Sequence, residues 1–308
     1  VDLLDSEAKS LPLSYLHNGV SAIVVIDKAG IPFLQALQSL LNQKFLRELI
    51  VVDRGAPKEL LETLQNIAEE LPHLKLIEDQ AHLTVLQGYQ LAAKRAVAKN
   101  LLFVEQHTVL PNLGVIQLLL ASLEMKEKNW IISAVSSFKP SLPEHELLDP
   151  KEAVLSMLKL HKPNMAFPKE STSLTAHVPA MGFGCFLIPR NAFWQSEGFD
   201  EGCHPSAAML DLCLKMHLKG GGVYKVPTLK VRTYGEPQEE SQFASLKGLI
   251  HFYRKHYADS PTKHWLAPLF MLLSLKALFK SVKKLFSWKS KLKKEPSLTE
   301  LLNKKTLA

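Results

Sequence analysis

Apolar, β-branched segments alternate with amphipathic segments over the first 140 residues, and this alternation constrains the fold more than any other feature. The four segments predicted as buried strands are Ser21–Ile26, Glu48–Val52, Leu74–Ile77 and Leu101–Val104. Helical spacing of apolar residues follows over residues 32–43, 57–71, 84–99 and 114–125. Strands and helices that alternate at these lengths predict right-handed βαβ units. The sequence therefore predicts an α/β fold, with a mostly parallel sheet flanked by helices.

The regular pattern weakens between about Phe138 and Pro179 and then returns. In this later part we expect strands at Gly184–Ile188, Tyr224–Val226 and Leu229–Val231, and helices near Glu152–Leu160, at Ser206–Leu218 and at Ser241–Tyr257. The expected organisation is a lead-in over residues 1–19, one α/β domain over residues 20–257 and a C-terminal extension over residues 258–308.

Composition excludes several classes of protein and places the basic charge at one end. A chain of 308 residues that is 46% apolar is not a disordered protein, and three cysteines are too few for a disulfide scaffold. The net charge is +7, but Pro261–Ala308 holds eleven lysines and two glutamates, so the preceding residues are slightly acidic. This distribution argues against nucleic acid as a partner, because nucleic-acid binders spread cations over a folded face.

The C-terminal extension has the pattern of an amphipathic helix that binds an anionic membrane surface. Trp265–Leu275 carries no charge, and the apolar residues Leu272, Leu275, Phe279, Val282 and Phe286 fall close to one helical face, with lysines beside or opposite it. The alternative is a helix that packs on its own domain, followed by a solvated lysine tail. With few cysteines and no signal-peptide pattern, we expect a cytoplasmic protein, peripheral on the inner face of the membrane.

Polar residues follow the predicted strands at the edge where such sheets bind ligands. Asp27 follows the first strand, Asp53 and Arg54 follow the second, and Glu105 and His107 follow the fourth. Open parallel sheets bind ligands at the carboxyl ends of their strands, where the strand order reverses. These residues predict a polar ligand such as a nucleotide sugar. The alternative is that acidic residues at strand ends only cap helices and face water.

Several blocks of the sequence, in order, resemble the inverting family-2 glycosyltransferases of the GT-A fold, especially bacterial rhamnosyltransferase-like members. The blocks are SLLNQ (Ser39–Gln43), ELIVVDRGAPKE (Glu48–Glu59), LLFVEQHTVLPN (Leu101–Asn112), GCFLIPRNAFWQSEGFDE (Gly184–Glu201), LDLCLKMHLKGGGVYKVP (Leu210–Pro227) and FYRKHY (Phe252–Tyr257). The GFDE block, followed about ten residues later by DLCL, is the most specific of them.

The resemblance implies transfer of a sugar from a nucleoside diphosphate to a glycan or lipid-linked acceptor of the cell envelope. It implies that Asp53 recognises the nucleoside, with Arg54 and Asp27 beside the nucleotide. A divalent cation, Mg²⁺ or Mn²⁺, would lie at Glu105 and His107 and neutralise the diphosphate. On the acceptor side, Asp200 and Glu201 would line the site, and either could serve as the general base.

Three departures from the family pattern fall on residues that carry the chemistry. His107 replaces the last acidic residue of the metal motif, Ala208-Met209 replaces the pair that contains the usual base, and the family's late histidine matches the neighbourhood of Arg232-Thr233-Tyr234. Two interpretations remain. Arg54 or Arg232 could neutralise the diphosphate while a residue of the 200–204 loop acts as base. Alternatively, the protein is a catalytically inactive relative that binds or scaffolds at the membrane.

A zinc site is a weaker alternative near the same loop. Cys213 and His217 are four residues apart on a predicted helix and could bind one metal ion, with Cys203 and His204. However, Cys203 and His204 are adjacent rather than spaced, so the pattern is not typical of a zinc site.

Overall fold

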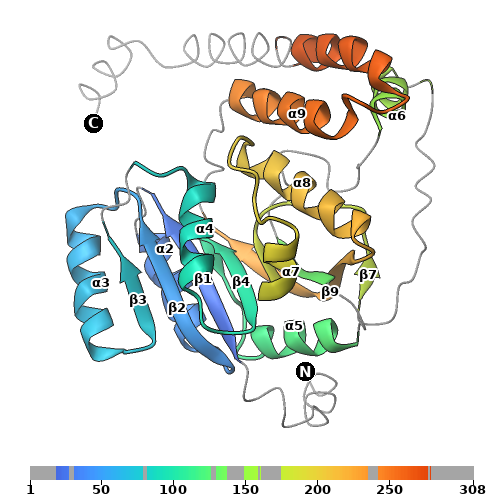
Figure 1. Cartoon of the computed structure of the whole chain (residues 1–308). Helices are drawn as coiled ribbons and strands as arrows, with labels where there is room; N and C mark the ends of the chain where they lie inside the picture. Colours follow the sequence, from blue (N-terminus) through green and yellow to red (C-terminus); the bar gives the residue numbers. More distant parts are fainter. Residues whose placement is uncertain are drawn as a thin grey trace, which may run out of the picture. The chain divides into compact units, whose positions relative to one another are not determined.

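The computed structural model of the chain describes residues 19–27, 31–78, 82–125, 130–136, 149–158, 160, 175–234, 242–276 and 278. The chain divides into two compact units (Figure 1). The first takes in residues 1–147 and 164–239, and the second takes in residues 148–163 and 240–308. All strands of the described residues belong to the first unit, so the strand ends singled out in the sequence lie there.

A mixed sheet forms the centre of the first unit, in the order β3-β2-β1-β4-β8-β6-β9-β5, with β7 paired to β9. The strands are β1 (Val20–Ile26), β2 (Leu46–Asp53), β3 (Leu74–Ile77), β4 (Asn100–Glu105), β5 (Thr108–Val109), β6 (Trp130–Ser136), β7 (Ala176–His177), β8 (Cys185–Pro189) and β9 (Gly222–Thr233). Strands β3, β2, β1 and β4 are parallel to one another, and β8 is antiparallel to β4. The predicted α/β fold is confirmed.

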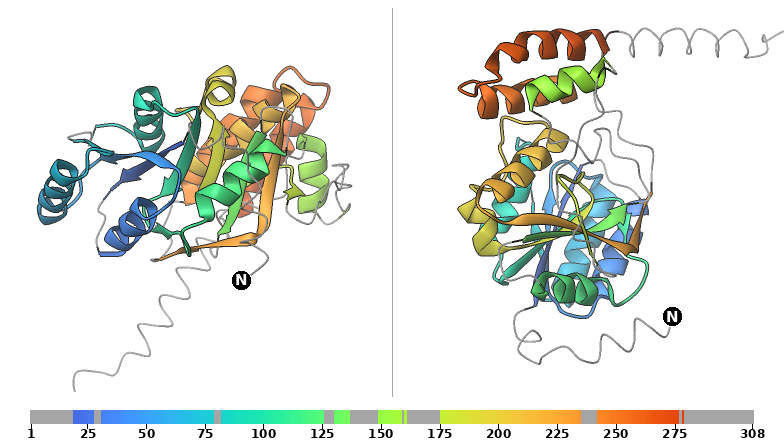
Figure 2. Two further views of the ribbon diagram at one scale, coloured as in Figure 1. Left: turned by 90° about the horizontal axis from the view of Figure 1, so that it is seen from below. Right: turned by 90° about the vertical axis from the view of Figure 1, so that its right-hand side faces the viewer.

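Helices cover both faces of this sheet (Figure 2). They are α2 (Ile31–Leu41), α3 (Lys58–Glu70), α4 (Val85–Arg95), α5 (Val115–Glu124), α7 (Arg190–Gln195) and α8 (Pro205–Leu218). Helices α2, α3 and α5 pack on the face of β1 that carries Val24 and Ile26. On the opposite face α4 approaches so closely that a Cβ on Gly88 would lie 3.1 Å from Cγ1 of Val25. Because successive strand residues face opposite sides, β1 is buried on both.

The structure has one long strand where two short ones were predicted, and three strands that the sequence pattern did not predict. The two short strands expected at residues 224–226 and 229–231 form the single strand β9, which continues past Pro227 because the register with β6 shifts there. The short strands β5 and β7 and the longer β6 were not expected. A two-residue strand has no periodicity of its own, so only its partner defines it.

The second unit contains helices α6 (Pro150–Met157) and α9 (Gln242–Tyr257), a short 3₁₀ turn at Lys263–Trp265 and a helix over residues 266–276. Asp149 caps α6, because its side chain accepts a hydrogen bond from the Glu152 N–H. The contacts of α9 place it in this unit. The predicted domain boundaries at residues 19/20 and 257/258 remain predictions. Among the described residues, no helix combines the length and apolar character that crossing a bilayer requires.

A buried carboxylate ties together the amino-terminal ends of the parallel strands. The side chain of Glu48 is 3% exposed and accepts hydrogen bonds from the Ser21 hydroxyl at 2.5 Å, the Lys75 ammonium at 2.5 Å and the Val97 N–H at 2.7 Å. These groups belong to β1, β3 and the segment after α4. Burial raises the pKa of Glu48, but the hydrogen bonds from Lys75, Ser21 and Val97 outweigh burial, so the pKa lies below its ordinary value.

We predict that Glu48→Gln destabilises the fold by roughly 2 kcal/mol, because it leaves the Lys75 ammonium without its buried anion. A carboxylate whose pKa is lowered by folding contributes stability above its unfolded pKa and loses it as the pH falls through its folded pKa. The difference between wild type and variant should therefore be full at neutral pH and shrink below about pH 4.5. Urea unfolding at several pH values measures it.

Glu62→Gln is the matched control for this prediction. Glu62 pairs with Lys58 at 3.5 Å, but both side chains are exposed, so its loss should cost less than about 0.5 kcal/mol. Equal effects of the two substitutions would contradict the role given to Glu48.

Candidate functional site

The candidate site lies where the parallel strands end and the strand order reverses, between β1 and β4. In the register of the sheet, Ile26 lies opposite Asp53 of β2, and Val25 lies opposite Glu105 of β4. The Asp27 N–H, just past β1, donates a hydrogen bond of 2.8 Å to Oε1 of Gln106, just past β4. The fold therefore brings Asp27, Asp53 and Glu105 to one edge, as the sequence predicts.

Asp53 shapes the turn that follows β2. Its Oδ1 accepts hydrogen bonds from the N–H of Gly55 at 2.9 Å and of Ala56 at 2.7 Å. Gly55 has a φ of +124°, a conformation that residues with a side chain rarely adopt. Both bonds end on Oδ1, so Oδ2 keeps its capacity to accept a hydrogen bond from a ligand. Asp53 is 6% exposed. Its two hydrogen bonds hold the turn in place without a bound ligand.

Arg54 connects three segments at the strand ends. Its Nη1 lies 3.3 Å from Oδ2 of Asp27, its Nε donates to the Leu83 carbonyl at 2.6 Å, and its backbone N–H donates to the Ile26 carbonyl. The side chain of Arg54 is largely buried, while that of Asp27 is about one-third exposed. The guanidinium is thus fixed beside β1 and β2, with one carboxylate partner that faces solvent.

His107 contributes a neutral imidazole beyond β4. Burial lowers the pKa of His107, because the charged ring would lose hydration there. Its Nδ1 is buried and has no hydrogen-bond partner among the described residues. Burial raises the pKa of Tyr89, and the negative charge of Glu105, two residues before His107, raises it further. The segment therefore offers one carboxylate and one uncharged nitrogen ligand.

Strand β9 brings two further functional candidates to His107. Thr108 and Val109 of β5 pair antiparallel with Thr233 and Arg232, and the Tyr234 N–H donates to the His107 carbonyl at 2.9 Å. Local sequence pattern could not link Arg232 and Tyr234 to His107, because they lie more than 120 residues apart in the chain; only the family resemblance pointed to them. The pairing places an arginine beside the segment that holds Glu105 and His107.

The segment from Glu105 to His107 could hold a divalent cation only if a bound ligand supplied further donor atoms. Glu105 and His107 supply an oxygen and a nitrogen donor, and the unpartnered Nδ1 of His107 is suited to such a role. Among the described residues, neither Glu105 nor His107 belongs to a group of three or more carboxylates, thiols or imidazoles whose ligand atoms lie within ligating distance of one another. Mg²⁺ commonly binds one or two protein side chains together with substrate phosphates, so the fit requires a diphosphate.

The two acidic residues expected on the acceptor side are both tied into the 200–204 loop. Asp200 Oδ1 accepts from the Gly202 N–H at 3.0 Å. Glu201 accepts from the side-chain amides of Gln87 at 2.9 Å and Gln90 at 2.8 Å, both in α4. Because α4 begins directly after Thr84, next to the Leu83 carbonyl that binds Arg54, these bonds hold the loop near the nucleotide-side residues.

The structure gives no proton acceptor at the position of the family's usual base. Ala208 and Met209 are fully buried in α8. Asp211 is buried as well and forms an ion pair of 2.7 Å with Lys215, whose ammonium also donates to the Gly198 carbonyl. Asp211 therefore anchors α8 to the GFDE turn. Any general base must come from another residue.

The zinc alternative is wrong for the described residues. Cys203, His204, Cys213 and His217 do not come together as a ligand group. Cys213 is fully buried, and burial raises the pKa of its thiol to about 12. Nε2 of His217 is 2.8 Å from the Pro179 carbonyl. The i, i+4 spacing is therefore part of a packed helix.

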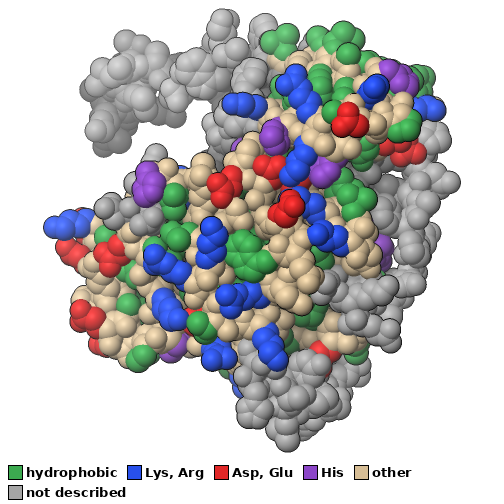
Figure 3. Space-filling model, viewed as in Figure 1, with side chains coloured by type: hydrophobic (Ala, Val, Ile, Leu, Met, Phe, Trp, Pro, Cys, Tyr) green, Lys and Arg blue, Asp and Glu red, His purple; other side chains and the backbone are tan. Residues whose placement is uncertain are grey.

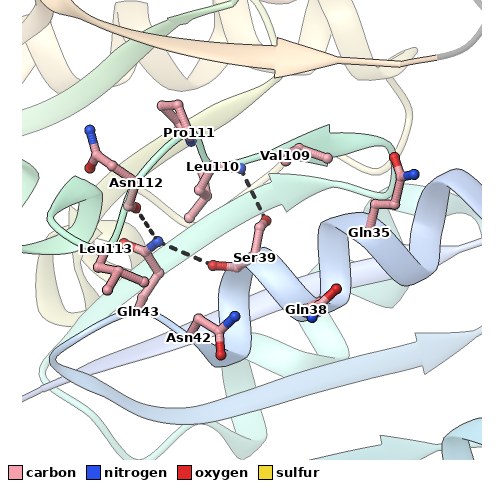
Figure 4. A pocket seen from close by; sticks show the side chains of 10 residues that line it. All are labelled: Gln35, Gln38, Ser39, Asn42, Gln43, Val109, Leu110, Pro111, Asn112 and Leu113. Carbon is pink, nitrogen blue, oxygen red and sulfur yellow. Dashed lines mark hydrogen bonds between the residues drawn. The ribbon is translucent and has the colours of Figure 1, made fainter.

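A shallow hollow of about 350 Å³ lies between α2 and the segment that begins at Val109 of β5 (Figure 4). Gln43 lines the hollow, and the side-chain amide of Gln43 donates hydrogen bonds to the carbonyls of Asn112 and Ser39. The Ser39 hydroxyl accepts from the Leu110 N–H. These bonds explain why the SLLNQ and TVLPN segments belong together: they join a helix to a loop and leave no charged side chain in the hollow.

Comparisons with known proteins agree on the fold. No family model matches the chain. The chain is 22% identical over 255 residues to N-acetylgalactosaminyltransferase 6 of Drosophila melanogaster, covering 78% of this chain and 38% of that protein. It therefore spans well under half the length of this relative.

Solved structures of low sequence identity share the architecture. GalNAc-T7 with UDP, GalNAc and Mn²⁺ superposes with a TM-score of 0.59 at 14% identity, over 82% of this chain and 54% of that one. The mannosyltransferase PcManGT from Pyrobaculum calidifontis, with GDP-Man and Mn²⁺, has a TM-score of 0.55 at 14% identity over 94% and 90%. TarS 1–349 of S. aureus has a TM-score of 0.52 at 15% identity over 92% and 77%. The fold is that of the GT-A glycosyltransferases.

We predict that Gly198→Ala destabilises the protein by roughly 2–3 kcal/mol. Gly198 has a φ of +63°, and an added Cβ would lie 2.4 Å from Oε1 of Gln90 and 3.1 Å from the Phe193 ring. Relief of the closer contact would displace Gln90, which holds Glu201. Thermal unfolding measures the loss.

Gly220→Ala separates the two causes. Gly220 has a similar φ of +72° but nothing within 4 Å of an added Cβ, so only the backbone cost of about 1 kcal/mol remains. Equal destabilisation by both substitutions would show that the contact with Gln90 and Phe193 is unimportant.

Proposed function

We propose that the protein binds a nucleoside-diphosphate sugar at the carboxyl ends of β1, β2 and β4 and transfers the sugar to an acceptor hydroxyl. The observation that carries this proposal is the gathering of Asp27, Asp53, Arg54 and Glu105 at the strand-order reversal of a GT-A fold. Proteins of this fold in the comparisons were solved with UDP, GDP-Man or UDP-GlcNAc. The finer likeness to rhamnosyltransferase-like enzymes is part of the proposal.

Asp53 is the proposed nucleoside contact. Its Oδ1 is fixed by Gly55 and Ala56, which leaves Oδ2 in a defined position for a ribose hydroxyl or a base N–H. A carboxylate held by backbone N–H groups loses little freedom when it binds, so the arrangement favours affinity. Asp27 sits one strand away and shares its charge with Arg54.

The diphosphate needs positive charge, and the chain supplies it in two ways. Arg54 already lies at the strand ends, and β9 brings Arg232 beside the segment that follows His107. Arginine binds phosphate through two parallel N–H groups, so either residue can accept the leaving diphosphate. Glu105 and His107 would hold Mg²⁺ or Mn²⁺ when it is bound, and the cation would act as a Lewis acid on the diphosphate oxygens.

The acceptor hydroxyl needs a base, and Asp200 is the proposed one. Glu201 accepts hydrogen bonds from the side-chain amides of Gln87 and Gln90, which hold its carboxylate against α4. Asp200 accepts a backbone N–H at Oδ1. We propose a cell-envelope polysaccharide or a lipid-linked glycan as the acceptor.

A second candidate function is binding without turnover. The buried Ala208 and Met209, at the position of the usual base, favour it. Such a protein would keep Asp27, Asp53 and Arg54, because their hydrogen bonds and ion pair also stabilise the fold. It would act as a scaffold. The two functions differ in turnover and need not differ in nucleotide binding.

We predict that the full chain binds UDP- or GDP-sugars in calorimetry, with micromolar to millimolar affinity. Asp53→Asn should weaken binding at least about tenfold, because the amide keeps an oxygen for the turn but loses the charge that attracts the ligand's donors. Asp259→Asn, at an exposed position of the second unit, is the control and should change nothing. No heat of binding with any such nucleotide at millimolar concentration, with or without Mn²⁺, would rule out the donor site.

We predict that Asp200→Asn lowers sugar transfer or donor hydrolysis at least about a hundredfold while the dissociation constant of the donor stays within about twofold. Release of the nucleoside diphosphate reports turnover. Glu201→Gln is the comparison and should lower the rate less, since its carboxylate is engaged by α4. Donor binding without measurable turnover in the wild type would instead support the non-catalytic candidate.

A further inference from the structure

The helix over residues 266–276 packs along one side only. Leu269 is 1% exposed, and Leu266, Phe270 and Leu273 are partly buried. The Arg254 guanidinium of α9 lies 5.5 Å from the Phe270 ring centroid, so this side of the helix contacts the rest of the second unit. The contacts fix how the helix is rotated about its axis, and hence which residues point away.

Three large apolar residues point to solvent from the other side. Met271 is 59% exposed, Leu275 is 42% exposed and Leu278 is 55% exposed. Their spacing of four and then three residues puts them in one stripe of a helix. We call these three residues the apolar stripe. Single exposed apolar residues are ordinary, but an aligned group of long side chains marks a surface that another phase or molecule covers.

The lysines near the apolar stripe favour an anionic lipid surface over a second copy of the chain as the partner that covers it. Lys263 and Lys276 are exposed in the same segment, and residues 279–308 hold nine lysines against two glutamates. Figure 3 shows Lys and Arg side chains beside apolar ones over this unit. A second copy of the chain would bring two strongly basic segments together, at a cost in repulsion. An anionic lipid surface accepts both the apolar side chains and the lysines.

We propose that the apolar stripe inserts into the headgroup–acyl boundary of an anionic bilayer, with the lysines on the phosphates. The structure changes the face expected from the sequence: Leu275 is kept, Met271 and Leu278 join it, and Leu272 is partly buried. The surface is separate from the strand ends and needs no nucleotide. Its failure would therefore leave the proposed donor site untouched, and the reverse also holds.

The test is co-sedimentation of the full chain with vesicles of phosphatidylcholine alone or with phosphatidylglycerol added. The wild type should bind the anionic vesicles, weakly or not at all the neutral ones, and less as salt rises. Met271→Ser, Leu275→Ser and Leu278→Ser together should lower the partition coefficient at least about tenfold, because three buried apolar side chains are lost.

The matched control removes three equally exposed apolar residues from the first unit. Val97→Ser, Leu113→Ser and Leu218→Ser together should leave vesicle binding within about twofold of wild type, since these residues are exposed but lie in no common stripe. Circular dichroism melts should show that both triple variants remain folded. Lys263→Gln with Lys276→Gln should lower binding to anionic vesicles and leave binding to neutral vesicles unchanged.

Three results would overturn the proposal. One is equal vesicle binding by the stripe variant and the wild type. Another is equal binding of the wild type to neutral and anionic vesicles. The third is a dimer in light scattering that the stripe variant abolishes while vesicle binding stays the same, since the stripe would then be covered by a second copy of the chain.

Discussion

The parallel pairing of β1 with both β2 and β4 is the constraint on which the candidate site depends. This pairing puts the ends of three strands at one edge, in a register that sets Ile26 opposite Asp53 and Val25 opposite Glu105. A slip of β1 by one residue would turn each of its side chains to the other face of the sheet and shift Asp27 away from Asp53 and Glu105. Glu48, at the opposite end of the strands, helps to fix that register through Ser21 and Lys75.

The polar groups at the strand ends use some of their atoms for the fold and leave others for the proposed ligand. Asp53 uses Oδ1 for its turn, Arg54 uses Nε for the Leu83 carbonyl, and Asp27 uses its backbone N–H for Gln106. Each residue is thus oriented by a hydrogen bond to the protein.

The sequence was sufficient for the elements that carry a repeating pattern and insufficient for those defined by distant partners. Strands β1 to β4 were predicted because their apolar runs are uninterrupted and separated by helical spacing. Strand β5 has two residues and exists only through its pairing with β9, so the neighbours of His107 could not be derived from local pattern. Likewise, the bonds from Gln87 and Gln90 to Glu201 span more than 110 residues. Sequence alone gave no signal for them.

The acidic residues near the site differ in the contacts that hold their carboxylates in place. These contacts restrict which of them could act as the general base. Asp211 is neutralised by Lys215 in the core, and Glu201 is held by two amides. Asp27 shares its charge with Arg54. A general base must come within hydrogen-bond reach of the acceptor hydroxyl, so a carboxylate held in the core or against a helix is poorly placed for that role. Asp200 lies in the loop that follows Phe199 and accepts the Gly202 N–H, whereas Glu105 is two residues from His107, where a diphosphate or a cation would compete for it. Under the proposed function, proton transfer would therefore fall to the loop that holds Asp200, because Ala208 and Met209 offer no proton acceptor.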